Sequence, residues 1–461
     1  MGRAWRAATV AVAFVLTPPR TLAQGGGAEG DGPAAADVVR QSRPSSVVPR
    51  PSSAGSELTV YHMVMGQGDA VWERFGHNAI WIHDAARGTD AVYNWGMFDF
   101  DQPNFLGRFV TGDTQYWMAG FDLESTLEVY GQHNRPVWVQ ELNLTPAQRD
   151  SLRRFVEWNA RPENMYYRYD YYRDNCSTRV RDALDLVLGG AIRRETDGVS
   201  TGNSYRWHTR RLLADDVPVY TGTNIGLGHP ADRPISRWEE MFLPTRMQKH
   251  FRSVVVSDGA GGVVPLVRAE RQLVAARRPP ERGGPPSRTG LFLSIGAAIG
   301  ALLLILSRPA AAGSRGARIS LALLGGAWSA VVGLLGAAVL ALSTLTRHVF
   351  TQWNENLLQF DPLALALVVL LPLVLLRRRA GRAAGLLRGA AVVVAVLAAA
   401  GLALKVFPAF YQQNAEVIAL ALPTHLAMAW AAWRVTRPGA ATATRADAPP
   451  LPAARRAASG R

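Results

Sequence analysis

The sequence is poor in cysteine, and this scarcity excludes several kinds of site. Its 461 residues include one cysteine, Cys176, so the chain cannot form an intramolecular disulfide. Its histidine, cysteine and aspartate residues show no spacing typical of metal ligands, so no zinc site and no cofactor are predicted. A lone thiol outside the cytoplasm is either incidental or a nucleophile, and that choice decides the function.

Acidic residues are also few, at 36 against 50 basic ones, which gives a net charge of +14. The basic residues flank apolar runs or gather in the C-terminal tail, and they form no stripe along one segment. This placement is typical of membrane topology signals, so nucleic-acid binding is not expected.

The N-terminus has the layout of a secretory signal peptide. Arg3 and Arg6 precede a short apolar run, and small residues follow up to Ala23, so residues 1–23 are interpreted as the signal. An uncleaved anchor is the alternative. Residues 24–56 are rich in Gly, Ala, Pro and Ser and are predicted to be a disordered tether.

The rest of the chain divides by composition. Residues 57–268 are rich in aromatic residues and suffice for one well-cored domain, and residues 269–289 form an Arg/Pro-rich linker. A membrane domain is predicted over 290–433, and a disordered cytoplasmic tail over 434–461.

About five apolar runs in the membrane domain are long enough to cross a bilayer. They are Gly290–Ser307, Ile319–Ser343, Leu357–Leu376, Leu387–Leu404 and Glu416–Trp433. Arginines cluster after the first, third and fifth runs, which places those loops in the cytoplasm. The preceding domain then lies outside, as the signal peptide independently predicts. We therefore expect a multi-pass protein of the bacterial inner membrane with a periplasmic domain.

Strands and helices are segregated in the predicted periplasmic domain, which favours an α+β fold. Strands are expected at Leu58–Met65, and at His77–His83 and Ala91–Phe98 as a hairpin. One helix is expected from Thr145-Pro146 to about Asn159, and a second from about Ser177 to Leu188.

Cys176 is predicted to lie at the N-terminus of this second helix, where free N–H groups and the helix dipole favour a thiolate. Arg173 and Arg179 would add to the effect if their side chains reach the sulfur. The alternative is that Cys176 is a small buried hydrophobic residue.

An imidazole is the usual partner of a reactive thiol, and His77 is the candidate for it. Asn94, on the strand paired with that of His77, is the candidate third catalytic group. Its alternative role is a hydrogen bond at a strand end.

Two further polar or aromatic groups have two possible roles each. The segment Tyr166–Tyr172 either lines a groove for an acyl chain or headgroup, or packs in the interior. The polar residues of the outward loops either hold a headgroup or are ordinary interfacial residues; they are His348, Asn354, Glu355, Asn356, Gln412, Gln413 and Asn414.

A histidine on an early strand, followed by Asn-Cys at a helix start, resembles the circularly permuted papain-like thiol enzymes. These include lecithin:retinol acyltransferase and permuted NlpC-type peptidases. Several segments resemble the Lnb family of bacterial lipoprotein N-acyltransferases more specifically. They are Gly66–Asp69, Phe75–Ile80, Val92–Phe98 and Tyr172–Thr178, with Asn354–Leu358 in the membrane half.

The resemblance implies an enzyme that moves an acyl chain from a membrane phospholipid to the N-terminal amine of a diacylglyceryl lipoprotein. Cys176 would carry the acyl group and His77 would move the protons, without a cofactor. Two rival interpretations stay open. One is a peptidoglycan amidase or endopeptidase of the permuted NlpC type, and the other is a membrane-tethered binding module without catalysis.

Overall fold

The structure, a computed structural model, describes residues 54–377 and 381–437. The predicted signal peptide, most of the predicted tether and residues 438–461 of the predicted tail lie outside the described residues. Residues 434–436 of that tail belong to the helix Ala415–Thr436, so the prediction of disorder is wrong there. The chain forms two compact units that interleave along the sequence. The first contains residues up to 223, 231–286 and 345–349, and the second contains 224–230, 287–344 and the chain from 350.

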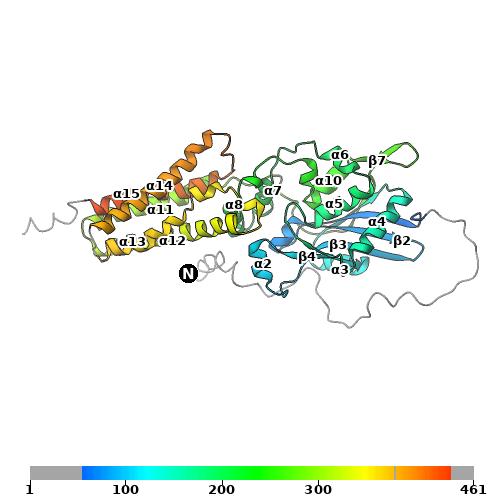
Figure 1. The fold of residues 1–461 in the computed structure, drawn as a ribbon, viewed down its shortest axis with the longest axis horizontal. Coiled ribbons are helices and arrows are strands. Elements are labelled where there is room, and N and C mark those ends of the chain that lie inside the picture. The colour runs from blue at the N-terminus through cyan, green and yellow to red at the C-terminus, as the bar shows by residue number, and fades with distance from the viewer. Residues whose placement is uncertain (1–53, 378–380, 438–461) are drawn as a thin grey trace, which may run out of the picture. The chain divides into compact units, whose positions relative to one another are not determined.

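An antiparallel sheet of seven strands is the centre of the first unit, in the order β6-β4-β3-β2-β1-β5-β9 (Figure 1). The strands are β1 Leu58–Met65, β2 His77–Asp84, β3 Thr89–Met97, β4 Gln115–Asp122, β5 Val137–Leu142, β6 Tyr166–Arg168 and β9 Val267–Val274. A separate two-stranded ribbon consists of β7 Val255–Ser257 and β8 Val263–Pro265.

Alternate residues of the central strands pack on opposite faces of this sheet. Leu58 and Val60 of β1 belong to one apolar core, which the helices α4 (Pro146–Asn159) and α5 (Cys176–Val187) cover. Met63 and Met65 belong to a core on the other face, which α3 (Leu123–Gln132) covers. The central strands of the sheet are therefore covered on both faces.

The elements predicted from sequence in this unit are confirmed. The strand Leu58–Met65 has the expected bounds, and β2 and β3 form the expected hairpin. Helix α4 begins at Pro146, with Thr145 as its cap and Gln148 completing a reciprocal capping box. The α+β interpretation of this part of the chain is thus correct.

The predicted linker is shorter than expected, because β9 continues to Val274. Residues of β9 pair with β5 along its length, for example Ala269 with Glu141 and Arg271 with Val139. The polar, arginine-rich sequence gave no strand signal because β9 is a mostly exposed edge strand.

The remaining helices of the first unit are short and lie mainly in the stretch after α5. They are α2 Phe105–Thr111, α6 Ala191–Thr196, α7 Tyr205–Leu212, α8 Val217–Gly226, α9 Arg237–Glu240 and α10 Pro244–Phe251, with η1 Val71–Phe75 before β2. The last three residues of α8, 224–226, belong to the second unit. The first two residues of η2 (His229–Ala231) belong to it as well.

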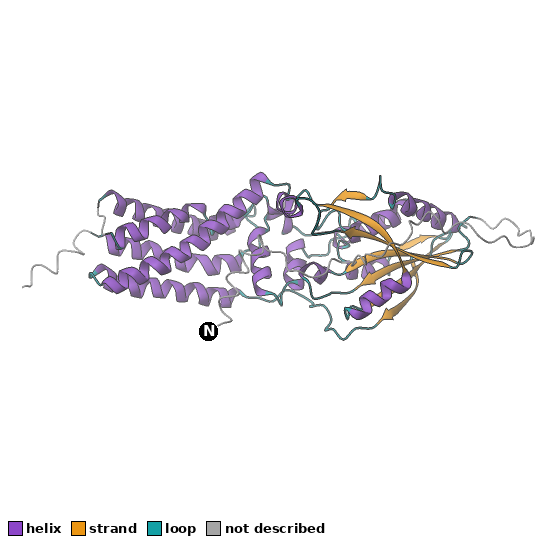
Figure 2. Ribbon diagram, turned by 90° about the horizontal axis from the view of Figure 1, so that it is seen from below, coloured by secondary structure: helices purple, strands orange, loops and turns teal. Residues whose placement is uncertain are grey.

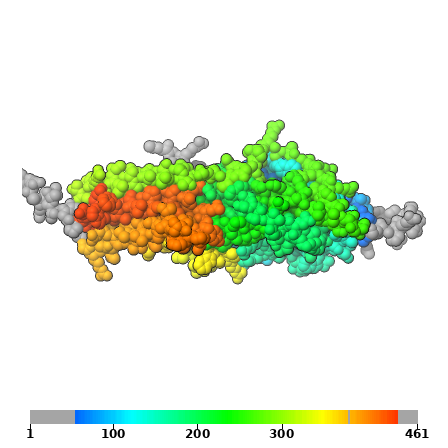
Figure 3. Space-filling model, turned by 90° about the horizontal axis from the view of Figure 1, so that it is seen from above, coloured from blue at the N-terminus to red at the C-terminus, as the bar shows by residue number. Residues whose placement is uncertain are grey.

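The second unit is helical, as the purple ribbons of Figure 2 show. Among the described residues, four of its helices are long and apolar enough to cross a membrane. They are α11 Thr289–Ala311, α12 Arg315–Leu345, α14 Arg382–Ala403 and α15 Ala415–Thr436. The atoms of α14 and α15, orange and red in Figure 3, form part of the outer face of this unit.

The third predicted span is not a continuous helix. The short helices η3 (Val349–Thr351) and η4 (Glu355–Leu358) come first, and η5 (Pro362–Ala364) and α13 (Leu365–Leu375) follow after a bend of 50°. Pro362 begins η5 and lacks the N–H that a continuous helix would need. The described residues therefore contain four candidate spans, or five if the bent pair is one.

Small residues let the first and last spans pack closely. A Cβ on Gly296 of α11 would lie 2.3 Å from the carbonyl oxygen of Leu420 in α15, and Gly300 is one turn further along. The hydroxyl of Thr424 donates to the Gly296 carbonyl at 3.0 Å. This small-xxx-small contact is typical of helix pairs in membranes.

Candidate functional site

Cys176 is the first residue of α5, and the start of this helix is held from both sides. The side chain of Asn175 accepts from the Thr178 N–H at 2.9 Å, and the Thr178 hydroxyl accepts from the Asn175 N–H at 2.8 Å. The Asn175 amide also donates to the carbonyls of Tyr171 and Phe242. The predicted position of Cys176 is therefore confirmed, and the backbone around it is fixed.

Cys176 is partly exposed as a residue. The backbone N–H groups of Asn78, Ser177 and Cys176 itself face the thiol closely enough to lower its pKa. Gly96 of β3 lies against the other side, and a Cβ there would be 3.2 Å from the Cys176 Cβ. Gly96 has φ +88°, so its backbone also requires glycine.

The environment of the thiol differs from the one expected at a helix start. Burial raises the pKa of the Cys176 thiol to about 11, and the backbone donors lower it only in part. Among side chains, the guanidinium of Arg135 lowers this pKa, whereas Arg179 pairs with Asp174. Burial of the thiol thus opposes the thiolate that the helix dipole favours, and the protonation state of Cys176 at rest stays a prediction.

His77, the first residue of β2, forms a pair with Asn94 of β3. Its Nε2 lies 3.0 Å from the Oδ1 of Asn94, and both side chains are buried. Asn94 also donates to the Val92 carbonyl, which fixes its amide. Because the amide oxygen accepts, His77 carries its proton on Nε2 and leaves Nδ1 as the basic nitrogen.

His77 is held neutral near physiological pH. Burial lowers the pKa of His77 to about 4; the charge of Arg135 lowers it further, and the Asn94 bond opposes both. The backbone N–H of Asn78, the next residue of β2, is close enough to Cys176 to lower the pKa of its thiol, so imidazole and thiol come from adjoining parts of the fold. The hydrogen bonds of the described residues do not include one between His77 and that sulfur.

A buried series of hydrogen-bonded side chains contacts Ser177, the second residue of α5. The Asn78 amide donates to the Ser177 hydroxyl at 2.5 Å and accepts from His62 at 3.1 Å. Gln140 of β5 contacts the other ring nitrogen of His62 at 2.9 Å. All four side chains are completely buried, so this series fixes the residue that follows the cysteine.

Comparison with known families agrees with this arrangement. Residues 50–215 match the family described as the Lnb N-terminal periplasmic domain. This part of the chain is an Lnb-type domain. The comparisons with curated proteins and with solved structures gave no match.

The Lnb-type domain contains every residue of the site described above, from His62 to Ser177. Its family places it in the periplasm, and the helical unit that follows is compatible with a multi-pass membrane protein. The roles of Cys176, His77 and Asn94 stay predictions, since the comparisons name no catalytic residue.

Three residues of the site were missed by the sequence analysis. Asn78 and Gly96 lie inside the segments that carry the family resemblance, next to His77 and Asn94, so proximity in sequence was the available signal. Arg135 has no such signal, because its role depends on burial beside Glu73 and the Gly66 carbonyl.

The tyrosines of the segment before the cysteine differ in burial: Tyr166 is exposed, Tyr172 is buried, and the three between them are partly buried. Tyr172 is buried against Tyr205, and Tyr169 stacks on Tyr116 with ring centroids 4.2 Å apart. A cavity of about 450 Å³ lies along α5 between Arg179 and Leu186, but Cys176 does not line it. The contacts of Tyr169 and Tyr172 favour the packing role for this segment.

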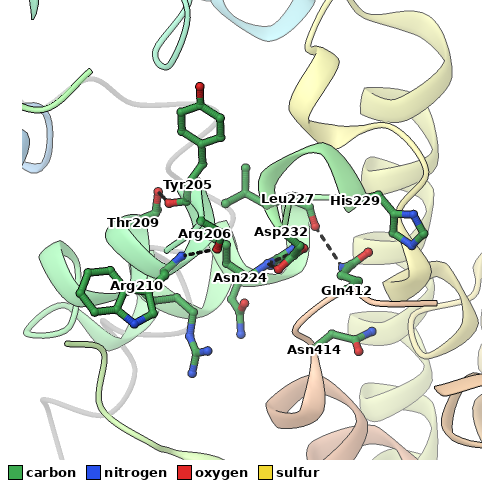
Figure 4. A network of polar contacts seen from close by, with 12 residues as sticks. Tyr205, Arg206, Thr209, Arg210, Asn224, Leu227, His229, Asp232, Gln412 and Asn414 are labelled. Atoms are coloured by element: carbon green, nitrogen blue, oxygen red, sulfur yellow. Dashed lines mark hydrogen bonds and ion pairs between the residues drawn. The ribbon is translucent and has the colours of Figure 1, made fainter. Parts of the chain in front are cut away.

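The polar outward loops of the second unit bind the chain segment 224–230. The Asn354 amide donates to the carbonyls of Ile225 and Gly226, and the Asn356 amide donates to those of Asn224 and Ile225. Figure 4 shows Gln412 donating to the Leu227 carbonyl at 3.1 Å. These buried amides hold protein backbone, so a structural role accounts for their polarity.

Charged groups complete this network within the second unit. Glu355 accepts from the side chains of His229 and Lys405 and from the Gln412 N–H. Glu355 is buried, and its partners compensate its charge. The network therefore joins the loops after α12 and α14 to the 224–230 segment.

Proposed function

We propose that this protein is a thiol acyltransferase that moves an acyl chain from a membrane phospholipid to the N-terminal amine of a diacylglyceryl lipoprotein. One observation carries the proposal: Cys176, at the capped start of α5, lies against Gly96 of β3 and near the backbone N–H of Asn78 of β2, and these two strands carry the His77–Asn94 pair. The Lnb-type domain and the apolar helices support a reaction at the membrane surface.

In the first half-reaction, the Cys176 sulfur attacks the carbonyl carbon of a phospholipid ester. Neutral His77 takes the thiol proton as the C–S bond forms, because the raised pKa of the Cys176 thiol leaves little thiolate beforehand. The C–O bond then breaks, and His77 returns the proton to the lyso-lipid oxygen. The products are acyl-Cys176 and a lyso-phospholipid.

In the second half-reaction, the amine of a diacylglyceryl-cysteine attacks the thioester. Such an amine has an ordinary pKa of about 7.7–8.0, so part of it is unprotonated at neutral pH. His77 accepts the proton from the attacking nitrogen, the C–S bond breaks, and the sulfur recovers its proton. The products are an N-acylated lipoprotein and free Cys176.

The backbone donors around the sulfur suit the charge that develops in both steps. In a tetrahedral intermediate the former carbonyl oxygen carries a negative charge, and N–H groups that lie about 3 Å from this oxyanion stabilise it. Asn78 and Ser177 supply such groups from a rigid strand and a capped helix. An inner-membrane location would confine enzyme and both lipid substrates to one surface, which raises their effective concentration.

The direct test is to trap the intermediate. Purified full-length protein in phospholipid vesicles, without acceptor, should carry an acyl group on Cys176 that hydroxylamine removes. Cys176→Ala should carry none, and His77→Ala should acylate about 10²- to 10⁴-fold more slowly. An unacylated wild-type Cys176 would refute the proposal.

The rival activities give different products in cells. Loss of the protein should remove the N-linked acyl chain from lipoprotein N-termini, as read by mass spectrometry. Altered cross-linked muropeptides with unchanged lipoproteins would instead indicate a peptidoglycan hydrolase. Full function of Cys176→Ala would indicate a binding module.

A further inference from the structure

Helix α2 of the first unit presents apolar side chains to the outside. Leu106 is 43% exposed, Phe109 is 48% exposed and Val110 is 38% exposed, all within one and a half turns. Single exposed apolar residues need no explanation, but a contiguous group on one helix marks an interaction surface.

The same helix is bound by the segment 345–349, which belongs to the first unit. The Arg347 N–H donates to the Thr111 carbonyl at 2.8 Å, and His348 Nε2 donates to the Phe109 carbonyl at 2.9 Å. Gly112 allows this approach, since a Cβ there would lie 3.1 Å from the Arg347 and His348 backbone. Arg347 also pairs with Asp113 at 2.9 Å.

The segment 345–349 follows a candidate membrane span without a break. Leu345 is the last residue of α12, a 31-residue helix that is long and apolar enough to cross a membrane. About 20 helical residues cross a hydrocarbon core, so the end of a 31-residue span lies at or beyond the bilayer surface. Residues hydrogen-bonded to Arg347 and His348 would then lie near that surface.

We propose that α2 is an interfacial helix whose Leu106, Phe109 and Val110 insert into the acyl region of the outer leaflet. Apolar side chains on one face of a surface helix bind a bilayer in this way, with basic residues at the headgroup level. Arg108 and Arg347 are the basic residues on this part of the unit.

A continuous series of rings connects this helix to the candidate nucleophile. Phe105 of α2 lies 6.2 Å from Phe98, which stacks on Tyr116 at 5.0 Å, and Tyr116 stacks on Tyr169 at 4.2 Å. Tyr169 and Cys176 both contact the position of a Cβ on Gly96. Close-packed rings are hardly compressible, so this series holds α2 and Cys176 at a fixed separation. The depth at which α2 inserts would then set the distance of the thiol from the bilayer.

The inference goes beyond the proposed activity and holds for any reaction at Cys176. It is tested on full-length protein in vesicles of phosphatidylcholine and phosphatidylglycerol. In a Cys176→Ser background, Phe109→Cys carries an environment-sensitive fluorophore, and spin-labelled phospholipids serve as quenchers. The matched control is Val263→Cys on β8, an apolar residue of the same unit that is 74% exposed.

The fluorophore at position 109 should emit at shorter wavelength and be quenched at least twofold more than the one at 263. Equal quenching at the two positions would overturn the inference. This measurement requires no turnover, so it stands or falls separately from the trapping of acyl-Cys176.

A second variant tests whether the apolar residues of α2 help the protein to reach phospholipid in the vesicle. Leu106→Ser with Phe109→Ser should raise the apparent KM for vesicle phospholipid about tenfold. The rate of Cys176 alkylation by a water-soluble reagent should not change, which would demonstrate an intact fold. A slower alkylation, or an unchanged KM, would contradict the insertion of this helix.

Discussion

His77 Nε2 lies 3.0 Å from the Oδ1 of Asn94, across the paired strands β2 and β3. The strand register brings the two side chains together. Ala79 lies opposite Asn94, and His77, two residues earlier in β2, is the diagonal neighbour on the same face. The bond orients the imidazole and raises its pKa against burial and Arg135. Asn94 is therefore expected to act on the sulfur through His77.

We expect Asn94→Ala to lower the rate of Cys176 acylation about 10- to 100-fold, because His77 loses both its orientation and part of its basicity. Asn94→Gln keeps an amide but moves it by one methylene, and should recover part of the rate. Equal rates for Asn94→Ala and the wild type would exclude a positioning role.

The thiol should react slowly with alkylating agents near neutral pH. Burial raises the pKa of Cys176 to about 11, so the reactive thiolate is a small fraction at pH 8. The iodoacetamide alkylation rate should still rise about tenfold per pH unit between pH 8 and 10. A plateau below pH 8 would mean that the thiolate is already formed at rest, and the proton-transfer step proposed here would be wrong.

Acid should destabilise the first unit well before its carboxylates are protonated. Burial lowers the pKa of His62 and of His77 to about 4, below the ordinary value of 6.5. Between those values the unfolded chain binds protons that the folded one does not, so stability falls as pH drops from 6.5 to 4. Denaturant melts followed by tryptophan fluorescence should record the decrease.

His62→Gln provides the control for this effect. The variant can keep a hydrogen bond to Asn78 but cannot titrate, so its loss of stability between pH 6.5 and 4 should be smaller than in the wild type. An identical pH dependence in both proteins would assign the effect to other groups.

Gly96→Ala should slow acylation strongly, because the added methyl would press on Cys176 and strain a backbone at φ +88°. Gly88→Ala is the matched control, with φ +64° but no atom within 4 Å of the new Cβ. Both variants should lose about 1–2 kcal/mol of stability from backbone strain. Only Gly96→Ala should also impair Cys176, and equal activity in the two would contradict the contact.

Local signals were sufficient for much of the fold. Thr145, Pro146 and Gln148 specify the start of α4 by their own side chains, so a short window of sequence contains the cause. The position of Cys176 was predictable for the same reason, since Asn175 and Thr178 cap α5 locally. The alternation of apolar residues in Leu58–Met65 likewise reflects burial on the two faces of the sheet.

Properties that depend on distant parts of the chain were not predictable. The pKa of Cys176 follows from burial, which many segments determine together. Arg135 acts on His77 across more than fifty residues of sequence, and β9 is a strand only because β5 offers an edge. The break at Pro362 was missed because hydropathy averages over a window and hides one residue.

The interleaving of the two units has a consequence for dissecting the protein. A cut between residues 275 and 286 would separate the sequence where composition suggests a boundary. It would nevertheless leave the helical fragment without residues 224–230. The side-chain amides of Asn354, Asn356 and Gln412 donate to backbone carbonyls of that segment. The other fragment would lack residues 345–349 beside α2. Neither half is a complete folding unit, and co-expressed fragments would have to reassociate to restore both sets of bonds.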